Sequence, residues 1–381
     1  MRGIYIHQLP SWPRFAWDWA QLAEPLAAVR LRQGRLIGHM EALGFSLRTE
    51  AVLETLTSDV IKSSEIEGER LDADQARSSI ARKLGVDIGG LKPADRNVEG
   101  VVEMMLDATG QYDQPLTATR LFGWHAALFP TGRSGLRKKT GHRRDDSTGP
   151  MQVVSGPIQR EKVHFEAPAA ARLPAEMKAF LKWFNAADKG DAVVKAALAH
   201  LWFVTVHPFD DGNGRIARAI ADMALARSEG SPQRFYSMSA QIRQERNVYY
   251  DILEQTQSGY TDVTGLDVTP LDITSWMDWF LACLGRAIDG AQTAFKGVLR
   301  KARFWETFAA TPLNDRQREV MNRLLDGFEG KLTTSKYAKL TKCSEDTALR
   351  DILSLVERGM LLRSASGGRS TSYALREIEA A

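Results

Sequence analysis

The stretch DAVVKAALAHLWFVTVHPFDDGNGRIAR, residues 191–218, decides how this chain folds. Residues 191–206 are apolar on nearly every side of a helix, which predicts a central, buried helix. They run directly into a loop, residues 207–214, that combines a histidine, two aspartates, two glycines and an asparagine. A second predicted helix follows and ends at Gly230, since glycine readily closes a helix. The predicted centre of the fold is therefore two helices joined by a polar loop.

The loop has the composition of a phosphate-binding site. Gly212, Asn213 and Gly214 can take backbone conformations closed to most residues, so their amides can converge on an anion. They stand at the start of the next helix, whose dipole also favours negative charge. Arg215 and Arg218 are three positions apart and share one face of that helix. We expect these residues to bind the phosphates of a nucleotide.

Two further side chains suggest the chemistry at this loop. Asp211 is a hard oxygen ligand suited to Mg²⁺ between two phosphates. His207 can accept a proton near neutral pH. An EF-hand is excluded because Ile216 would stand at its glycine position, and no GxxxxGK[ST] phosphate loop occurs. A zinc site would need more histidine or cysteine than the nearby His200.

Extended to Arg218, the loop reads HPFxDGNGRxxR and resembles the signature of the Fic family without deviation at its fixed positions. The resemblance implies a mainly α fold: a Fic helical core with a β-hairpin flap, an N-terminal helical region and a C-terminal winged helix. It also implies a protein adenylyltransferase, which moves AMP from ATP to a Ser, Thr or Tyr hydroxyl of a target protein or of itself. The intact DGNGR favours AMP over other transferred groups.

The resemblance assigns a role to each signature residue. His207 would be the general base, and Asp211 would hold Mg²⁺ between the α- and β-phosphates. The anion hole and the contacts to the distal phosphates would come from five residues: Gly212, Asn213, Gly214, Arg215 and Arg218.

The flap is expected at residues 151–168, where two β-favouring runs flank SGPIQRE. It would align an unknown target protein by backbone pairing. This hairpin is the single strand pair that we predict before the C-terminal region.

Residues 249–257, YYDILEQTQ, resemble the adenine-pocket helix of Fic proteins. Tyr249 and Tyr250 could contact the base, or both could be core residues. Gln257 stands where some relatives have asparagine.

The segment SSEIEG, residues 63–68, fits [S/T]xxxE[G/N] and resembles the inhibitory helix of self-inhibited Fic proteins, with Ser63, Glu67 and Gly68 at the fixed positions. Glu67 would pair with Arg218 and compete with the triphosphate. Residues 1 to about 60 also resemble the N-terminal region of such proteins. Two alternatives stay open: a Ser64–Glu67 capping box with a helix end at Gly68, or a Glu67 that positions water to remove AMP from a modified protein.

The C-terminal residues 331–373 predict a helix, a turn, a helix and a hairpin around Gly367 and Gly368, which is the winged-helix pattern. Ser344 is expected to cap the second helix. The apolar face of that helix is expected at four positions: Leu349, Ile352, Leu353 and Val356.

Basic residues in 331–373, among them Arg350 and Arg369, would suit DNA, but Glu345 and Asp346 beside the expected recognition helix oppose it. A protein-interaction or structural module is the favoured interpretation. A DNA-binding regulator with a vestigial nucleotide pocket is the third hypothesis for the whole chain. The intact His207 argues against it, since a pure binding pocket needs no base.

Composition agrees with a soluble intracellular protein. A net charge of +3 is too weak to imply nucleic acid by itself. Two cysteines, Cys283 and Cys343, indicate neither a disulfide framework nor a zinc cluster, as in a reducing cytoplasm. No signal peptide or membrane span is expected, so we predict a cytoplasmic protein without a membrane partner. Homodimerisation is expected from the resemblance.

The predicted domain organisation has three parts. Residues 1–100 form the N-terminal helical region with the inhibitory helix, residues 101–298 the catalytic core, and residues 310–381 the winged-helix-like domain. A charged connector is expected near residues 299–315.

Overall fold

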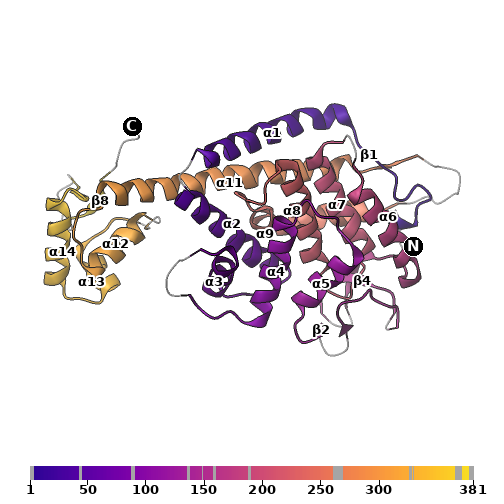
Figure 1. The fold of residues 1–381 in the computed structure, drawn as a ribbon, viewed down its shortest axis with the longest axis horizontal. Coiled ribbons are helices and arrows are strands. Elements are labelled where there is room, and N and C mark those ends of the chain that lie inside the picture. Colours follow the sequence, from indigo (N-terminus) through magenta and orange to yellow (C-terminus); the bar gives the residue numbers. More distant parts are fainter. Residues whose placement is uncertain are drawn as a thin grey trace. The chain divides into compact units, whose positions relative to one another are not determined.

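In the computed structural model, the chain forms two compact units, Met1–Ala291 and Gln292–Ala381 (Figure 1). The structure describes the following residues: 4–42, 45–86, 91–134, 138–147, 149–157, 160–187, 190–260, 269–325, 328, 330–364 and 371–376. Among these residues, none of the helices combines the length and the apolar character that a membrane span requires.

Two helices form the centre of the first unit, as the sequence predicts. Helix α7 (Ala192–Val206) is buried over almost its whole length, and α8 (Asn213–Glu229) packs beside it. Helix α8 ends at Gly230, which has the expected left-handed conformation with φ of 62°. Because α7 is buried on nearly all of its faces and α8 is buried beside it, the loop that joins them is anchored at both ends by buried helices.

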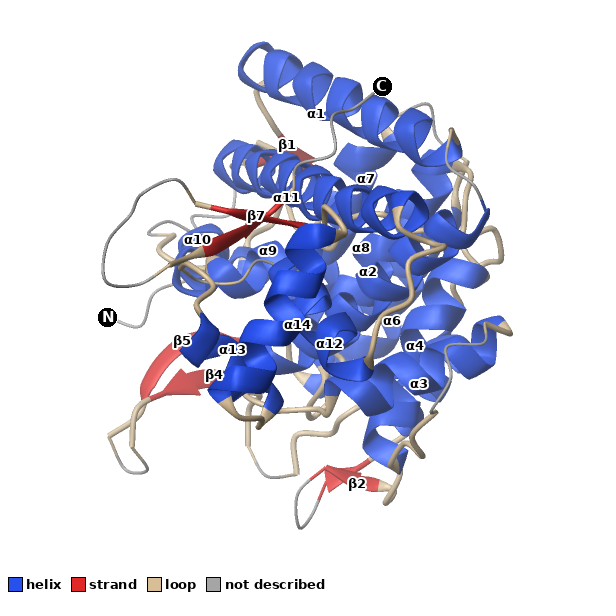
Figure 2. Cartoon of the chain, turned by 90° about the vertical axis from the view of Figure 1, so that its left-hand side faces the viewer, coloured by secondary structure: helices blue, strands red, loops and turns tan. Residues whose placement is uncertain are grey.

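Further helices surround this pair, and α1 packs along the first part of α11 (Figures 1 and 2). Most begin at a capping side chain, and the predicted cap Thr117 accepts the amide of Arg120 at 3.1 Å. Their bounds are α1 Trp19–Glu41, α2 Phe45–Ile66, α3 Ala73–Leu84, α4 Arg96–Gly110, α5 Ala118–Leu128, α6 Leu173–Asn185, α9 Met238–Gln244, α10 Arg246–Gln257 and α11 Thr274–Thr307.

A buried polar cluster joins α2 to α8. Asp59 on α2 accepts a hydrogen bond from Ser237 at 2.5 Å, and Asp222 on α8 pairs with Arg234 at 3.0 Å. Burial, and then the charge of Asp222, raises the pKa of Asp59 to about 8. Asp59 is therefore protonated near neutral pH in the folded protein.

The predicted flap is present as an antiparallel pair, β4 (Gln152–Ser155) and β5 (Lys162–Glu166), beside α10 (Figure 2). Residues 158–159 of its turn lie outside the described residues. The prediction of a single strand pair before the C-terminal region was wrong. Strands of two residues show no alternation that a sequence could reveal. The additional pairs are β1 (Phe15–Ala16) with β6 (Leu271–Asp272), which is parallel, and β2 (Arg133–Ser134) with β3 (Lys138–Lys139), which is antiparallel.

In its described residues, the second unit has three helices, a short hairpin and the last part of α11. Its core includes Phe304, Tyr337 and Ile352. Ser344 caps α14 as predicted, and its hydroxyl accepts the amide of Thr347 at 3.3 Å. The expected turn residues Gly367 and Gly368, and Arg369, lie outside the described residues. The elements are α12 Asp315–Leu325, α13 Thr334–Thr341, α14 Glu345–Glu357, β7 Leu361–Arg363 and β8 Tyr373–Leu375.

Two expectations for this unit were wrong. Leu349 and Leu353 do not belong to the buried face of α14, because they are 40% and 49% exposed. Ile352 is buried as predicted, the rest of the buried stripe is Ala348 and Leu355, and Val356 is partly buried against the core. The expected connector at residues 299–315 is helical as far as Thr307, where α11 ends.

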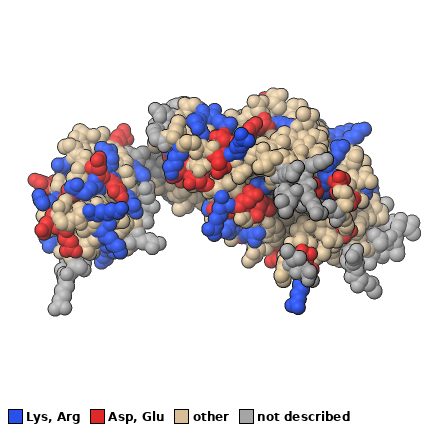
Figure 3. Space-filling view, turned by 90° about the horizontal axis from the view of Figure 1, so that it is seen from below, with Lys and Arg blue, Asp and Glu red and all other residues tan. Residues whose placement is uncertain are grey.

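Acidic and basic side chains are intermixed on the face of residues 292–381 that Figure 3 shows. Asp351 of α14 pairs at 2.9 Å with Arg316 of α12, which lies outside segment 331–373. On the face that Figure 3 shows, acidic side chains interrupt the basic ones, whereas phosphate contacts favour continuous positive charge. Leu349 and Leu353 of α14 are exposed apolar side chains.

Candidate active site

A cleft of about 560 Å³ opens between the flap, the loop after α7 and helix α10. It gathers most of the residues that the sequence singles out. They are Glu67, His207, Asp211, Gly212, Asn213, Gly214, Tyr249, Tyr250 and Gln257. Ser63, Gly68, Arg215 and Arg218 are not in its wall.

The loop is braced from inside by the side chain of Asn213. Its amide group donates to the carbonyl of Phe209 at 2.8 Å and accepts the amide of Phe209 at 3.0 Å. Gly212 has φ of 76°, and a Cβ there would lie 3.1 Å from Leu128. The Asn213 side chain is thus committed to the loop, which leaves the backbone at the start of α8 to face an anion.

His207 is held as a neutral base. Its Nδ1 lies 3.2 Å from the carbonyl oxygen of Val204. Because a carbonyl only accepts, Nδ1 carries the proton and Nε2 keeps its lone pair. Burial lowers the pKa of His207 to about 4. The imidazole is therefore uncharged at neutral pH and able to accept a proton at Nε2.

Arg144, which the sequence did not single out, fixes the backbone at His207. Its Nε donates to the carbonyl of His207 at 2.7 Å, and its amide donates to Pro208 at 3.0 Å. No spacing in the sequence indicates a contact between residues so far apart along the chain.

Glu67 and Arg218 form an ion pair, with Oε1 and Nη2 2.8 Å apart. Arg218 is 1% exposed and Glu67 29% exposed at the side chain. Ser63 completes the set, because Arg218 Nε donates to its hydroxyl at 2.9 Å and Nη2 to its carbonyl at 2.8 Å. Burial opposes the charge of Arg218, but Glu67 raises its pKa above the usual value.

The Glu67 carboxylate lies directly over the start of α8. A Cβ added to Gly214 would come 2.2 Å from Glu67 Oε1, so this glycine makes room for the carboxylate. Gly68 has φ of 85° and follows the last turn of α2. The alternative capping box is wrong, because the buried Ser64 hydroxyl has no hydrogen-bond partner among the described residues.

A second acidic residue that the sequence analysis missed, Glu69, pairs with the other signature arginine. Its Oε2 lies 2.5 Å from Arg215 Nη1, and the Arg215 guanidinium also lies 5.3 Å from the ring centroid of Phe129. Both arginines of the signature are therefore neutralised by carboxylates from one short segment.

The predicted adenine-pocket residues differ in what they offer to a ligand. Tyr249 is buried and lies 2.9 Å from Nε2 of His200, whose pKa burial lowers to about 3. Gln257 donates to the hydroxyl of Thr205 at 2.8 Å. Tyr250 is partly exposed and has the Arg246 guanidinium 4.9 Å from its ring centroid. Of the three, Tyr250 presents the most accessible surface.

Whether the site fits Mg²⁺ depends on the surroundings of Asp211, the predicted metal ligand. One of its oxygens accepts the amide of Gly212 at 2.6 Å, and the residue is exposed in the cleft wall. The described residues hold no cluster of three or more metal-binding side chains. Mg²⁺ is commonly held by one or two carboxylates together with substrate phosphates, so the donor chemistry fits a metal that arrives with a nucleotide.

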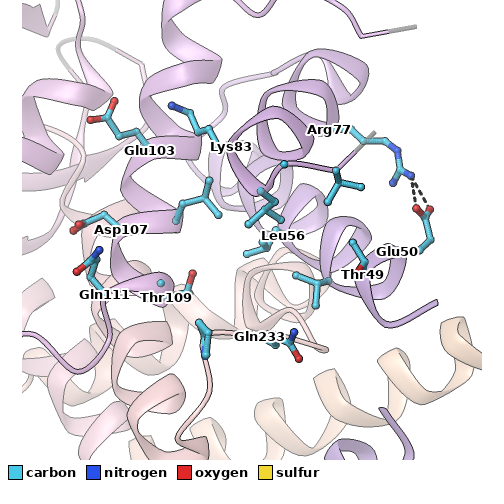
Figure 4. Close-up of a pocket in the computed structure, with 17 residues that line it drawn as sticks. Thr49, Glu50, Leu56, Arg77, Lys83, Glu103, Asp107, Thr109, Gln111 and Gln233 are labelled. Carbon is cyan, nitrogen blue, oxygen red and sulfur yellow. Dashed lines mark hydrogen bonds and ion pairs between the residues drawn. The ribbon is translucent and has the colours of Figure 1, made fainter. Parts of the chain in front are cut away.

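A larger hollow of about 1080 Å³ lies elsewhere, bounded by α2, α3 and α4 (Figure 4). Its described lining contains no histidine, serine or cysteine. Arg77 and Glu50 at its edge are paired with each other at 2.7 Å. We therefore place the chemistry in the smaller cleft, where a base, an anion site and a carboxylate meet.

Comparison with known proteins agrees with this placement. Residues 115–225 match the family model described as Fic/DOC family, and residues 5–86 match a domain of unknown function, DUF4172. Two solved structures have a similar fold. A Fic family protein from Desulfovibrio desulfuricans G20 has 19% identity and a TM-score of 0.51, covering 97% of this chain and 99% of that one. A Fic domain containing signaling protein from Bacteroides thetaiotaomicron VPI-5482 has 23% identity and a TM-score of 0.52, covering 71% and 97%.

Relatives in sequence carry the name "Protein adenylyltransferase Fic". The protein of Nematostella vectensis is 32% identical over 126 residues, which is 32% of this chain and 25% of that one. The protein of Aedes aegypti is 27% identical over 284 residues, which is 71% and 49%. The chain thus spans at most about half the length of these relatives. It contains a Fic/DOC domain on a mostly helical Fic fold, and its homologues at modest identity are Fic adenylyltransferases.

Proposed function

We propose that the protein is a Mg²⁺-dependent protein adenylyltransferase that its own Glu67 restrains. It moves AMP from ATP to a Ser, Thr or Tyr hydroxyl of a target protein. The observation that carries the proposal is the neutral His207, with Nε2 able to accept a proton, in one cleft with the glycine-rich start of α8. A base beside an anion site is what transfer of a phosphorus group to a hydroxyl needs.

The reaction would follow from the positions of these groups. His207 Nε2 takes the proton of the target hydroxyl while the hydroxyl oxygen bonds to the α-phosphorus. The bond from the α-phosphorus to the bridging oxygen breaks, and pyrophosphate leaves with its electrons. Backbone amides at Gly212–Gly214 bind the phosphate oxygens. Asp211 would hold Mg²⁺, which supplies positive charge to the phosphates when bound.

The two signature arginines would serve the distal phosphates once their acidic partners leave. Arg218 is occupied by Glu67 and Arg215 by Glu69. A triphosphate must compete with these carboxylates and meets their repulsion. This supports a restrained enzyme that binds nucleotide weakly until segment 67–69 moves.

The flap would hold the target. Its strands β4 and β5 form a two-stranded sheet, and β4 together with part of β5 lines the cleft. A two-stranded sheet leaves backbone edges on which an extended segment can pair. Such docking reads backbone more than side chains, so the sequence carries little trace of the target.

The proposal is tested with ATP labelled at the α-phosphate and a cell lysate. The Glu67→Gly variant should label proteins, and the Glu67→Gly/His207→Ala variant should not. ATP labelled at the γ-phosphate is the control, because AMP transfer leaves that label on pyrophosphate. Equal labelling by both variants would contradict the role of His207.

Removal of AMP from a modified protein is the second candidate. Glu67 supports it, because its carboxylate lines the cleft beside Gly214 and could position a water. The same variant separates the two reactions. Glu67→Gly should increase AMP transfer, whereas it should abolish AMP release if Glu67 positions the water.

DNA binding through residues 331–373 is not proposed as the main function. The mixed charge and exposed leucines of α14 favour a protein-interaction or structural module. The DNA hypothesis and homodimerisation stay predictions.

A further inference from the structure

A serine, a histidine and a glutamate form a hydrogen-bonded chain in the flap side of the cleft. The hydroxyl of Ser155, the last residue of β4, lies 2.6 Å from His164 Nε2 on β5. His164 Nδ1 lies 2.6 Å from Oε2 of Glu254 on α10. All three residues line the same cleft as His207 and Gly214. None of these three residues belongs to the signature.

The positions of the protons follow from the charge of Glu254. Lys162 Nζ lies 3.0 Å from Glu254 Oε1. Partial burial opposes ionisation, but hydrogen bonds from His164 and Lys162 lower the pKa of Glu254. The carboxylate therefore accepts from Nδ1–H, which leaves the lone pair of Nε2 to accept the Ser155 hydroxyl. This is the order nucleophile, base and orienting acid that activates a serine.

The Ser155 hydroxyl is also accessible. Ser155 is exposed at the end of its strand. Other serine hydroxyls are engaged differently: Ser63 binds Arg218, Ser237 donates to the buried Asp59, and Ser147 donates to Asp145. Within the described part of the chain, Ser155 is the serine whose hydroxyl is bonded to an imidazole. An accessible nucleophile with its own base lies in the wall of the nucleotide cleft.

We propose that Ser155 is an acceptor of AMP within the same chain, with His164 as its base. This rests on the proposed function, because the co-substrate is ATP bound in that cleft. Ser155 Oγ bonds to the α-phosphorus, the bond to the β-phosphate oxygen breaks, and pyrophosphate leaves. The hydroxyl proton passes to His164 Nε2 and then to solvent. Glu254 acts as a positioning residue, because it orients the imidazole.

The test uses the Glu67→Gly variant with Mg²⁺ and ATP, followed by peptide mass spectrometry. An AMP adduct is expected on Ser155, with a rate constant that does not change with protein concentration. In the same background, Ser155→Ala should lose this adduct. His164→Gln keeps polar groups but loses the base, so it should slow the reaction about 100-fold. Ser147→Ala is the matched control, because Ser147 is exposed but bonded to a carboxylate, and it should retain the adduct.

The outcomes separate the two proposals. AMP on lysate proteins or on other residues of the chain, but never on Ser155, overturns the acceptor proposal while AMP transfer stands. No AMP on any protein overturns both. An adduct at Ser155 that forms at the same rate in His164→Gln overturns the assignment of the base.

Discussion

Replacing Glu67 by glycine should release the nucleotide site. The change removes a charge-assisted hydrogen bond of 2.8 Å to Arg218, which is almost fully buried. Such a bond contributes about 1.5–3 kcal/mol. In the variant, a terminal phosphate can bind Arg218 without displacing the Glu67 carboxylate. The affinity for ATP should therefore rise about 10- to 150-fold, at 1.4 kcal/mol for each factor of ten.

The same change should lower stability. Arg218 keeps its bonds to Ser63 but loses its counter-charge, which should cost about 1–3 kcal/mol of the free energy of unfolding. Affinity and stability therefore move in opposite directions. Glu65→Gln is the matched control, because Glu65 lies two positions before Glu67, in the last turn of α2, but pairs with Lys62 and Arg243.

The assay is calorimetric titration with Mg²⁺ and a non-hydrolysable ATP analogue, with thermal unfolding of each variant in parallel. We expect tighter binding and a lower Tm for Glu67→Gly, and unchanged binding for Glu65→Gln. Binding by Glu67→Gly that is no tighter than wild type would refute the assignment of Glu67 as the restraining group. An equal gain in Glu65→Gln would attribute the effect to α2 in general.

Three other expected outcomes concern Glu69, His207 and Asp59. Glu69→Gln should raise ATP affinity by less than about fivefold, because a pair whose carboxylate side chain is 45% exposed contributes about 1 kcal/mol or less; titration beside Glu67→Gly measures this. In an NMR titration, His207 should change protonation near pH 4, as burial dictates, and a midpoint near the ordinary histidine value of 6.5 would contradict its neutral state. Asp59 binds a proton when folded up to about pH 8, whereas an aspartate in the unfolded chain releases its proton near pH 3.8. The folded state therefore holds more protons across this window, and stability should fall as pH rises through it. Thermal unfolding of Asp59→Asn should lose the part of that slope between about pH 6 and pH 8, because Asp222, whose pKa burial raises to about 6, contributes at lower pH.

The central loop could be predicted because its chemistry is local. The αL backbone of Gly212 and the amides at the start of α8 are fixed by neighbours in sequence, so residue types and spacing were enough. The Glu67–Arg218 contact joins distant segments, and only the family resemblance pointed to it. Geometry added that the Asn213 side chain braces Phe209 and that Gly214 makes room for the carboxylate.

Other features could not be predicted, because tertiary contacts create them. Glu69 reaches Arg215 across 146 positions, and His164 meets Glu254 across 90. Neither pair has a spacing that a helix or a strand imposes. On α14, the core contains the predicted Ile352 together with Ala348, whereas Leu349 and Leu353 point away from it, since each residue turns the helix by about 100°.

The most direct measurement of the central claim is a crystal structure of the Glu67→Gly variant with Mg²⁺ and a non-hydrolysable ATP analogue. We predict that phosphate oxygens lie within hydrogen-bond distance of the backbone amides at Gly212–Gly214, with the α-phosphorus on the side of His207 Nε2. An empty cleft, or a nucleotide bound in the hollow between α2, α3 and α4, would contradict the account.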